Sequence, residues 1–159
     1  MEVSPAGPAV IWHYTLRQHY QGMLQTGTIQ PSAAYAPRPT KPAVWFTTRP
    51  DWDPIVNKAI LCADETRRAL SRDELHTVGL GPMRLGVAAQ LAPLTWHEFK
   101  RQSGIPSKAA SNLVAAAARL QSHPSQWFAT FEPVPRSEWV AVEQWDGWRW
   151  TSVSELAGG

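Results

Sequence analysis

The chain has 159 residues and a formal net charge of +2, and 18% of its residues are charged. A charge balance this mild does not by itself indicate a nucleic-acid-binding protein, although an isoelectric point near 8.9 favours an anionic partner. The single cysteine, Cys62, excludes an internal disulfide, and the five scattered histidines do not have the spacing of zinc ligands.

We expect one domain over residues 1–159, which begins with a loose arm at residues 1–9 that is rich in proline, glycine and alanine. The sequence begins without a signal-peptide pattern, and no apolar run is long enough to span a bilayer. The expectation is therefore a cytoplasmic protein without a membrane partner.

The first predicted elements are a buried strand and a helix that follows it directly. Residues 10–15 are apolar, β-branched and aromatic, which predicts a strand that carries His13 near its end. Thr15 is the expected N-cap of the helix and Gly27 its C-cap. The expected apolar face consists of Leu16, Tyr20, Met23 and Leu24. A histidine at this junction is either a functional group or a satisfied core residue.

The middle of the chain begins with a predicted loop at residues 30–42, which contain four prolines and form either a binding loop or a surface connection. Residues 43–48 are a predicted strand, since they are aromatic and β-branched. Residues 55–63 are ambiguous between helix and strand. A helix is expected over residues 65–76 and a further strand over residues 83–88.

Two more helices are expected before the chain turns to strands. Thr95 and Glu98 match a capping box, which predicts a short helix to about Gln102. Ser107 is the expected cap of an alanine-rich helix over residues 108–120.

The C-terminal third has the pattern of β-strands, at residues 127–131, 138–145 and 148–151. Asp146-Gly147 predicts a two-residue hairpin turn between the last two strands. Together the elements predict an α+β fold around a mixed or antiparallel sheet.

Several chemistries find little support in the sequence. There is no glycine-rich phosphate loop and no dinucleotide fingerprint. Cys62 lies in an apolar run, which favours a buried structural thiol over a nucleophile. Trp148 and Trp150 alternate with Arg149, which is the pattern of either a stacking platform for nucleic acid or a packed hairpin face.

Three stretches resemble the ADP-ribosyltransferase family in the broad sense that includes bacterial toxins and RNA 2′-phosphotransferases. Residues 12–15, with the helix that closes in residues 23–31, resemble the opening strand of that family, its terminal histidine and its Leu-x-x-Gly-x-Ile close. Residues 44–48 are similar to the aromatic and hydroxyl-bearing second strand. Residues 137–143 resemble the late strand that carries an acidic residue.

The resemblance implies an ADP-ribosyltransferase-like fold, in which split mixed or antiparallel sheets with flanking helices form a cleft. It also implies that NAD is a co-substrate and that no metal is needed. The nicotinamide–ribose bond would break through an oxocarbenium-like transition state, which a preorganised carboxylate stabilises. ADP-ribose would pass to a nucleic acid or a protein, and a toxin-like member would be expected to have an antitoxin partner.

The resemblance also implies roles for particular residues. His13 would position the ribose, and either Glu138 or Glu143 would be the catalytic carboxylate. Glu143 lies mid-strand and would be desolvated unless paired, so Arg84 is either its partner or a ligand of the NAD pyrophosphate. The NAD-binding candidates are His13, Tyr14, Thr15, Tyr20, Trp45, Phe46, Thr47 and Arg84. Thr47 and Thr48 would orient the carboxylate.

The chain departs from the family pattern at two places. Phe46-Thr47-Thr48 only approximates the Ser-Thr-Ser triplet, and Arg136 stands two residues before Glu138, where arginine-modifying toxins carry Gln or Glu. Two other functions therefore remain open. A non-catalytic nucleotide- or protein-binding module would place His13 and both glutamates outside one cleft. An RNA 2′-phosphate-processing enzyme would bring Arg17 and Arg84 together beside His13.

Overall fold

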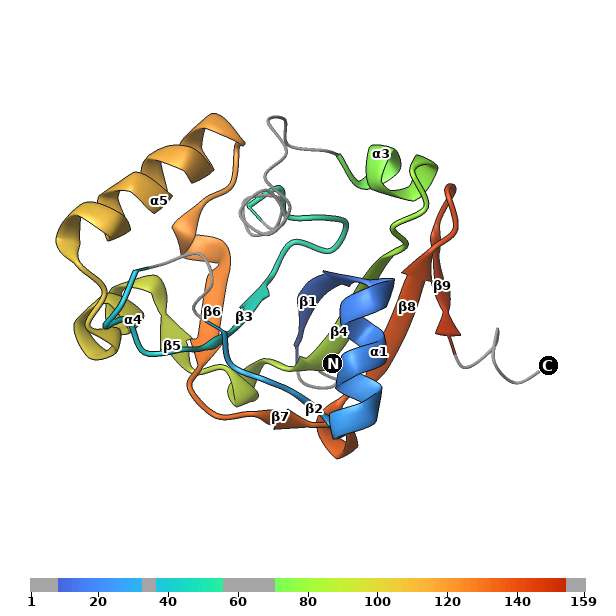
Figure 1. The fold of residues 1–159 in the computed structure, drawn as a ribbon, viewed down its shortest axis with the longest axis horizontal. Helices are drawn as coiled ribbons and strands as arrows, with labels where there is room; N and C mark the ends of the chain where they lie inside the picture. The colour runs from blue at the N-terminus through green and yellow to red at the C-terminus, as the bar shows by residue number, and fades with distance from the viewer. Residues whose placement is uncertain (1–8, 33–36, 56–70, 154–159) are drawn as a thin grey trace, which may run out of the picture.

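The computed structural model describes residues 9–32, 37–55 and 71–153 (Figure 1). Their strands form a seven-stranded sheet in the order β5-β6-β3-β1-β4-β8-β9 and a two-stranded sheet of β2 and β7. All the pairings between these strands are antiparallel. The structure thus confirms the α+β class, with a largely antiparallel sheet.

The strands are β1 (Val10–Leu16), β2 (Thr28–Ile29), β3 (Val44–Thr47), β4 (Pro82–Ala88), β5 (Leu94–Thr95), β6 (Trp127–Thr130), β7 (Val134–Pro135), β8 (Ala141–Trp145) and β9 (Trp150–Ser152). The helices are α1 (Arg17–Thr26), α3 (Arg72–Thr77), α4 (Trp96–Ser103) and α5 (Ser107–Arg119), with 3-10 turns η1 (Ala89–Leu91), η2 (Pro124–Gln126) and η3 (Arg136–Glu138). None of the helices in the described ranges is long and apolar enough to cross a membrane.

The junction of β1 and α1 confirms the predicted strand, helix and Gly27 C-cap but not the predicted N-cap. Gly27 has a φ of 75° and its N–H donates to the Met23 carbonyl. Thr15 stays in β1, because that strand pairs with β4 along its whole length, and Leu16 is the N-cap without a side-chain bond. Leu24 is 36% exposed and does not join the apolar face.

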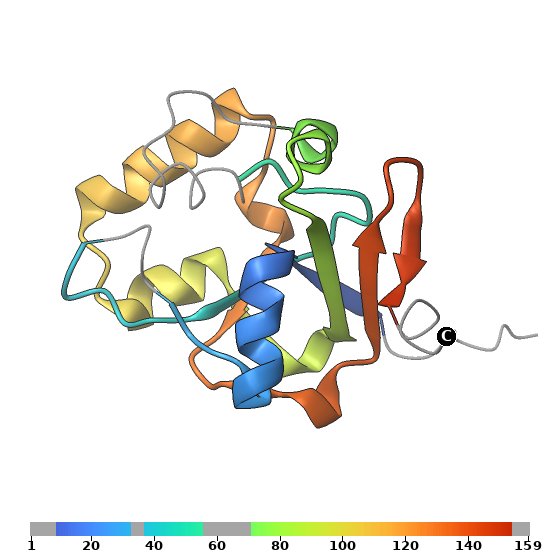
Figure 2. The ribbon, with the colours of Figure 1, turned by 45° about the vertical axis from the view of Figure 1, so that its right-hand side comes forward.

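The two faces of the large sheet carry different layers (Figure 2). Helix α1 covers one face, where Tyr20 packs in a core with Ile11, Phe46 and Leu85. Helices α4 and α5 cover part of the opposite face, where their side chains form a second core with Ala43, just before β3, and with Trp127 and Ala129 of β6. We call these the α1 face and the α5 face. Because side chains alternate along a strand, each residue of β1 faces one layer or the other.

The predicted caps of the middle helices are partly confirmed. The Thr95–Glu98 capping box forms at the start of α4. The predicted Ser107 cap is wrong by one residue, since Pro106 is the N-cap of α5 and supplies no side-chain bond. The described part of the helix expected over residues 65–76 is α3, which begins after a capping box at Ser71. Residues 56–70, with most of the ambiguous segment and Cys62, lie outside the described residues.

The C-terminal strands differ from the prediction at both ends of β8. The strand begins at Ala141, because residues 136–138 form η3 and the Trp139 N–H donates to the Arg136 carbonyl. The hairpin loop has four residues, since Trp145 pairs with Trp150. The prediction of a two-residue turn at Asp146-Gly147, a type that needs positive φ at both residues, is wrong: of the two, only Gly147 has a positive φ, at 98°. The Pro-rich loop is confirmed for the described part of residues 30–42, apart from one bridge between Ser32 and Ala43.

Candidate functional site

His13 lies on β1 near the centre of the large sheet and faces the α1 side. Its Nδ1 donates a hydrogen bond to the main-chain oxygen of Trp45 at 2.8 Å, and its ring centroid lies 5.8 Å from that of Phe46. A nitrogen that bonds to a carbonyl must carry the proton, so in the neutral ring Nε2 is left as an acceptor. Burial lowers the pKa of His13; the bond to Trp45 opposes this shift and His19 adds to it. The ring is therefore neutral at pH 7.

Other predicted site residues share the α1 face with His13. Phe46 is 2% exposed and Tyr20 is 9% exposed, and both belong to the core beneath α1. Thr15 is buried two residues along β1, on the same face by alternation. These side chains place apolar surface and one buried hydroxyl on the same face of the sheet as His13.

Glu138 also lies on the α1 side of the sheet, but its side chain is exposed in η3. Two contacts fix η3 beside α1. The Arg136 N–H donates to the Gly27 carbonyl at 2.9 Å, and the Trp139 ring lies 6.3 Å from that of Tyr20. The Glu138 side chain is therefore exposed to solvent on the same side of the sheet as α1. The sequence predicts Glu138 at the start of a strand, whereas the structure places it in η3.

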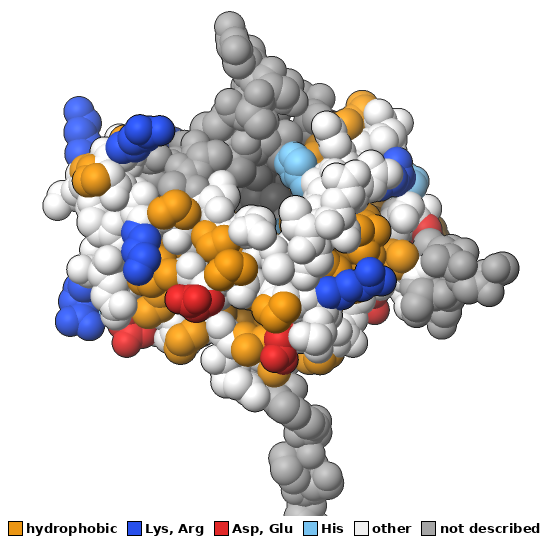
Figure 3. Space-filling view, turned by 60° about the horizontal axis from the view of Figure 1, so that its bottom comes forward, with side chains coloured by type: hydrophobic (Ala, Val, Ile, Leu, Met, Phe, Trp, Pro, Cys, Tyr) orange, Lys and Arg blue, Asp and Glu red, His pale blue; other side chains and the backbone are white. Residues whose placement is uncertain are grey.

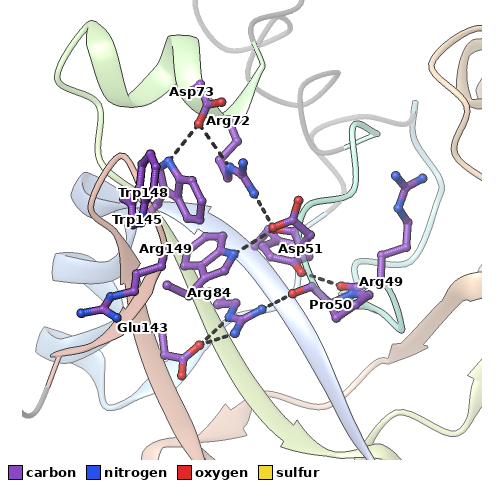
Figure 4. A network of polar contacts seen from close by, with 12 residues as sticks. Arg49, Pro50, Asp51, Arg72, Asp73, Arg84, Glu143, Trp145, Trp148 and Arg149 are labelled. Carbon is purple, nitrogen blue, oxygen red and sulfur yellow. Dashed lines mark hydrogen bonds and ion pairs between the residues drawn. The ribbon is translucent and has the colours of Figure 1, made fainter.

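Glu143 and Arg84 lie on the opposite face of the sheet from His13. Tyr14, Arg84 and Glu143 are register partners across β1, β4 and β8, so their side chains point to the same side. The Nε and Nη2 atoms of Arg84 lie 2.6 and 2.5 Å from one oxygen of Glu143 (Figure 4). Arg84 is thus the structural partner of Glu143, and the structure does not bring either residue together with His13.

Aromatic rings enclose this ion pair. The Arg84 guanidinium lies 3.9 Å from the centre of the Trp12 ring and 4.8 Å from that of Trp150. The Trp150 ring also packs against Tyr14 at 5.8 Å and against Trp145 at 5.4 Å. Arg84 therefore does not converge with Arg17 beside His13, as an RNA 2′-phosphate-processing enzyme would require.

The same group of side chains holds the 49–51 segment, which follows β3, against the α5 face (Figure 4). Three consecutive main-chain oxygens accept bonds from three different strands. The Tyr14 hydroxyl donates to Arg49 O at 2.5 Å, Arg84 donates to Pro50 O, and Trp150 Nε1 donates to Asp51 O at 3.0 Å. Burial raises the pKa of Tyr14, so its hydroxyl remains a donor over the whole physiological range.

Trp45 and Thr47 also face away from His13. Trp45 packs in the second core, with its ring 4.6 Å from that of Phe99. The Thr47 hydroxyl donates to Asp53 at 2.8 Å. The exposed Thr48 follows the end of β3, with its N–H bonded to the Gln126 carbonyl. These residues therefore support the fold at the positions where the resemblance implied NAD contacts or a hydroxyl that orients the carboxylate.

Asp53 is a buried carboxylate that the sequence did not single out. It is 0% exposed, and besides Thr47 it accepts bonds from the Ser122 hydroxyl at 2.5 Å and the Ile55 N–H at 3.3 Å. Ser122 in turn accepts a bond from Trp127 Nε1 at 3.0 Å. The only sequence signal was the turn composition of residues 49–54, which predicts a bend but not a carboxylate held by a serine 69 residues away.

One face of the molecule shows no dedicated pattern of basic charge (Figure 3). On the face drawn in Figure 3, the Lys and Arg side chains lie at separate places and do not form one stripe. Within residues 9–32, 37–55 and 71–153, no group of three or more His, Cys, Asp or Glu residues is placed to hold a metal ion. Comparisons of the chain with protein-family models, curated proteins and solved structures found no match, so no relative supplies a function for these residues.

Proposed function

We propose that this protein is an NAD-dependent ADP-ribosyltransferase that binds NAD on the α1 side of its sheet, in an ADP-ribosyltransferase-like cleft. The state of His13 is the observation that carries the proposal. Its Nδ1–H is committed to the Trp45 carbonyl at 2.8 Å, and its lowered pKa keeps the ring neutral. A ring held in this tautomer offers Nε2 as an oriented acceptor for a ribose hydroxyl.

The roles of the other residues follow from their side of the sheet. Phe46 and Tyr20 share the α1 face with His13, but both rings are buried in the core, so they support the His13 side of the sheet and do not offer a free face to nicotinamide. Glu138 is the glutamate on this side, whereas Glu143 is paired with Arg84 on the other. We assign Glu138 to stabilise the positive charge that develops on the ribose when the nicotinamide bond breaks.

The experiment is the release of nicotinamide from NAD by the wild type and by His13→Ala and Glu138→Gln variants. Glu132→Gln is the matched control, because Glu132 is also an exposed glutamate in the loop before η3. We expect both site variants to lose about 100-fold or more in turnover, the usual effect of removing a preorganised charge or hydrogen bond, and the control to retain it. The absence of NAD turnover by the wild type, with and without nucleic acid or protein acceptors, would refute the proposal.

A second candidate is a non-catalytic module that binds a nucleotide. It is favoured by one observation: His13 and Glu143 lie on opposite faces of the sheet, and Glu138 is exposed in a 3-10 turn. A titration calorimetry experiment with NAD separates the two candidates. Binding that depends on His13, without nicotinamide release, would establish the binding module in place of the enzyme.

A further inference from the structure

Trp148 is the most exposed large apolar side chain of the described residues. It is 86% exposed at the tip of the β8–β9 hairpin. The neighbouring tryptophans of the hairpin are engaged: Trp145 Nε1 donates to Asp73, and Trp150 Nε1 donates to Asp51 O. The sequence pattern of alternating tryptophans around Arg149 therefore resolves into a packed ring, Trp150, and a free ring, Trp148.

The turn that presents Trp148 is rigid. One carboxylate oxygen of Asp146 accepts bonds from the N–H groups of Trp148 at 2.8 Å and Arg149 at 2.9 Å, and the other accepts from Thr151 at 3.0 Å. The first two bonds hold the pKa of the Asp146 carboxyl below its ordinary value. At Gly147 an added Cβ would lie 2.8 Å from His76 Nε2, so α3 supports the turn from one side. Because the backbone on either side of Trp148 is held in this way, only the side chain itself needs ordering when a ligand stacks on the indole.

The charges around the ring favour an anionic ligand. The exposed Arg149 follows Trp148 directly, and no carboxylate of the described residues forms an ion pair with it. The ionised Asp146 carboxylate is directed into the turn, where it accepts bonds from two backbone N–H groups and the Thr151 hydroxyl. A stable protein interface usually covers about 800 Å² per partner around an apolar centre. The exposed apolar surface at this tip is a single indole, between Gly147 and Arg149. It is therefore better suited to a ligand with one flat ring and an adjacent negative charge than to a protein partner.

We propose that the β8–β9 tip binds single-stranded nucleic acid, with a base stacked on Trp148 and a phosphate near Arg149. Base stacking on an exposed aromatic ring with a neighbouring arginine is the usual mode of sequence-tolerant single-strand binding. The binding itself is independent of the proposed enzyme activity. If the protein is an ADP-ribosyltransferase as proposed, this binding implies that nucleic acid is the class of acceptor for ADP-ribose; only this implication rests on the proposed function.

The test is fluorescence anisotropy with a labelled single-stranded oligonucleotide of about 12 nucleotides, as DNA and as RNA, without NAD. We expect Trp148→Ala to weaken binding about 5- to 100-fold and Trp148→Phe to weaken it less, because phenylalanine still stacks. Arg149→Ala should reduce the slope of log affinity against log salt concentration by about one, which is the change expected for the loss of one phosphate contact. Arg101→Ala, which removes an exposed charge from the last turn of α4, is the matched control and should leave the affinity of the tip unchanged.

Two outcomes would overturn the inference. One is the absence of single-strand binding by the wild type, and the other is equal binding by the wild type and Trp148→Ala. Urea unfolding of each variant verifies the fold, since an exposed substitution should change the free energy of unfolding by no more than about 0.5 kcal/mol. Nicotinamide release without an acceptor is measured on the same variants. We expect His13→Ala to lose nicotinamide release and Trp148→Ala to retain it. Nicotinamide release therefore tests the proposed enzyme activity, and oligonucleotide binding separately tests the inference about the tip.

Discussion

Arg84 and Glu143 form an ion pair through two nitrogens and a single oxygen, with Nε at 2.6 Å and Nη2 at 2.5 Å. Their side chains are only 12% and 24% exposed, and the guanidinium lies against the Trp12 ring. Both residues were candidates for NAD chemistry from the sequence. Their pairing gives Glu143 a structural function, because losing either partner would leave the other charge half-buried without compensation.

We expect Glu143→Gln to lower the free energy of unfolding by about 1–3 kcal/mol, since a neutral amide replaces the partner of a half-buried guanidinium. The double variant with Arg84→Met should recover part of this loss, because no unpaired charge then remains. Urea denaturation of the two single variants and the double variant measures the coupling. Purely additive losses would contradict the pairing, as would a large loss of NAD turnover in a Glu143→Gln protein that remains folded.

Ser122→Ala should destabilise the protein by about 1–3 kcal/mol, although it removes only one oxygen atom. The Ser122 hydroxyl donates to buried Asp53 and accepts from Trp127, so alanine leaves both groups without that partner. The matched control is Ser125→Ala, at an exposed serine in η2. Thermal or urea unfolding of the two variants should differ clearly, and equal stabilities would mean that the Asp53 network contributes little.

His13 should make the folded state less stable at acidic pH. Its pKa is lowered in the folded protein by burial, so the unfolded chain binds the proton more tightly. Stability is therefore complete above the unfolded pKa of about 6.5 and falls as the pH decreases below it, by about 1.4 kcal/mol per pH unit until the folded pKa is reached.

The measurement is the urea midpoint at pH 7.5 and at pH 5.5 for the wild type, His13→Asn and the exposed-histidine control His97→Asn. We expect the wild type and the control to lose stability at the lower pH, and His13→Asn to lose less. The asparagine amide nitrogen can still donate to the Trp45 carbonyl, so the hydrogen bond is largely retained. An equal pH dependence of all three proteins would contradict the burial of a neutral His13.

Gly147→Ala should cost about 1–2 kcal/mol, because the residue has a φ of 98° and its added Cβ would approach His76 at 2.8 Å. Gly22→Ala is the control, since Gly22 lies within α1 with nothing within 4 Å of an added Cβ. Replacing glycine by alanine inside a helix should stabilise the protein slightly. Differential scanning calorimetry should therefore show shifts of opposite sign, and a stable Gly147→Ala variant would argue against the rigid turn.

Signals carried by neighbouring residues were sufficient for much of the fold. Short apolar and β-branched runs predicted β1, β3, β4 and β6, and Gly27 and the Thr95–Glu98 pair marked helix ends that the structure confirms. Where a local sequence signal and strand pairing favour different structures, the observed structure follows the strand pairing. Thr15 has the chemistry of an N-cap, but the ladder between β1 and β4 extends through Leu16 and keeps Thr15 in the strand.

The arrangement of the site depends on register, which sequence neighbours do not reveal. His13 and Tyr14 are adjacent and were assigned to one cleft, yet alternation sends their side chains to opposite faces of the sheet. For Glu143 the sequence leaves Arg84 open as a partner or as a pyrophosphate ligand, and the register of β4 and β8 confirms the partner, 59 residues away. Glu138 was placed at a strand start because residues 138–145 alternate, but η3 takes its backbone out of the ladder.

The bonds to the 49–51 segment have a consequence for how this chain can change in length. Surface connections usually accept added residues at little cost, because loop closure depends only weakly on length. Between Arg49 and Asp51, however, three successive carbonyl oxygens are matched to Tyr14, Arg84 and Trp150 on three separate strands. A single residue inserted within this segment would move at least one of these oxygens away from its donor, so the spacing between Arg49 and Asp51 is constrained by the three strands that the segment crosses.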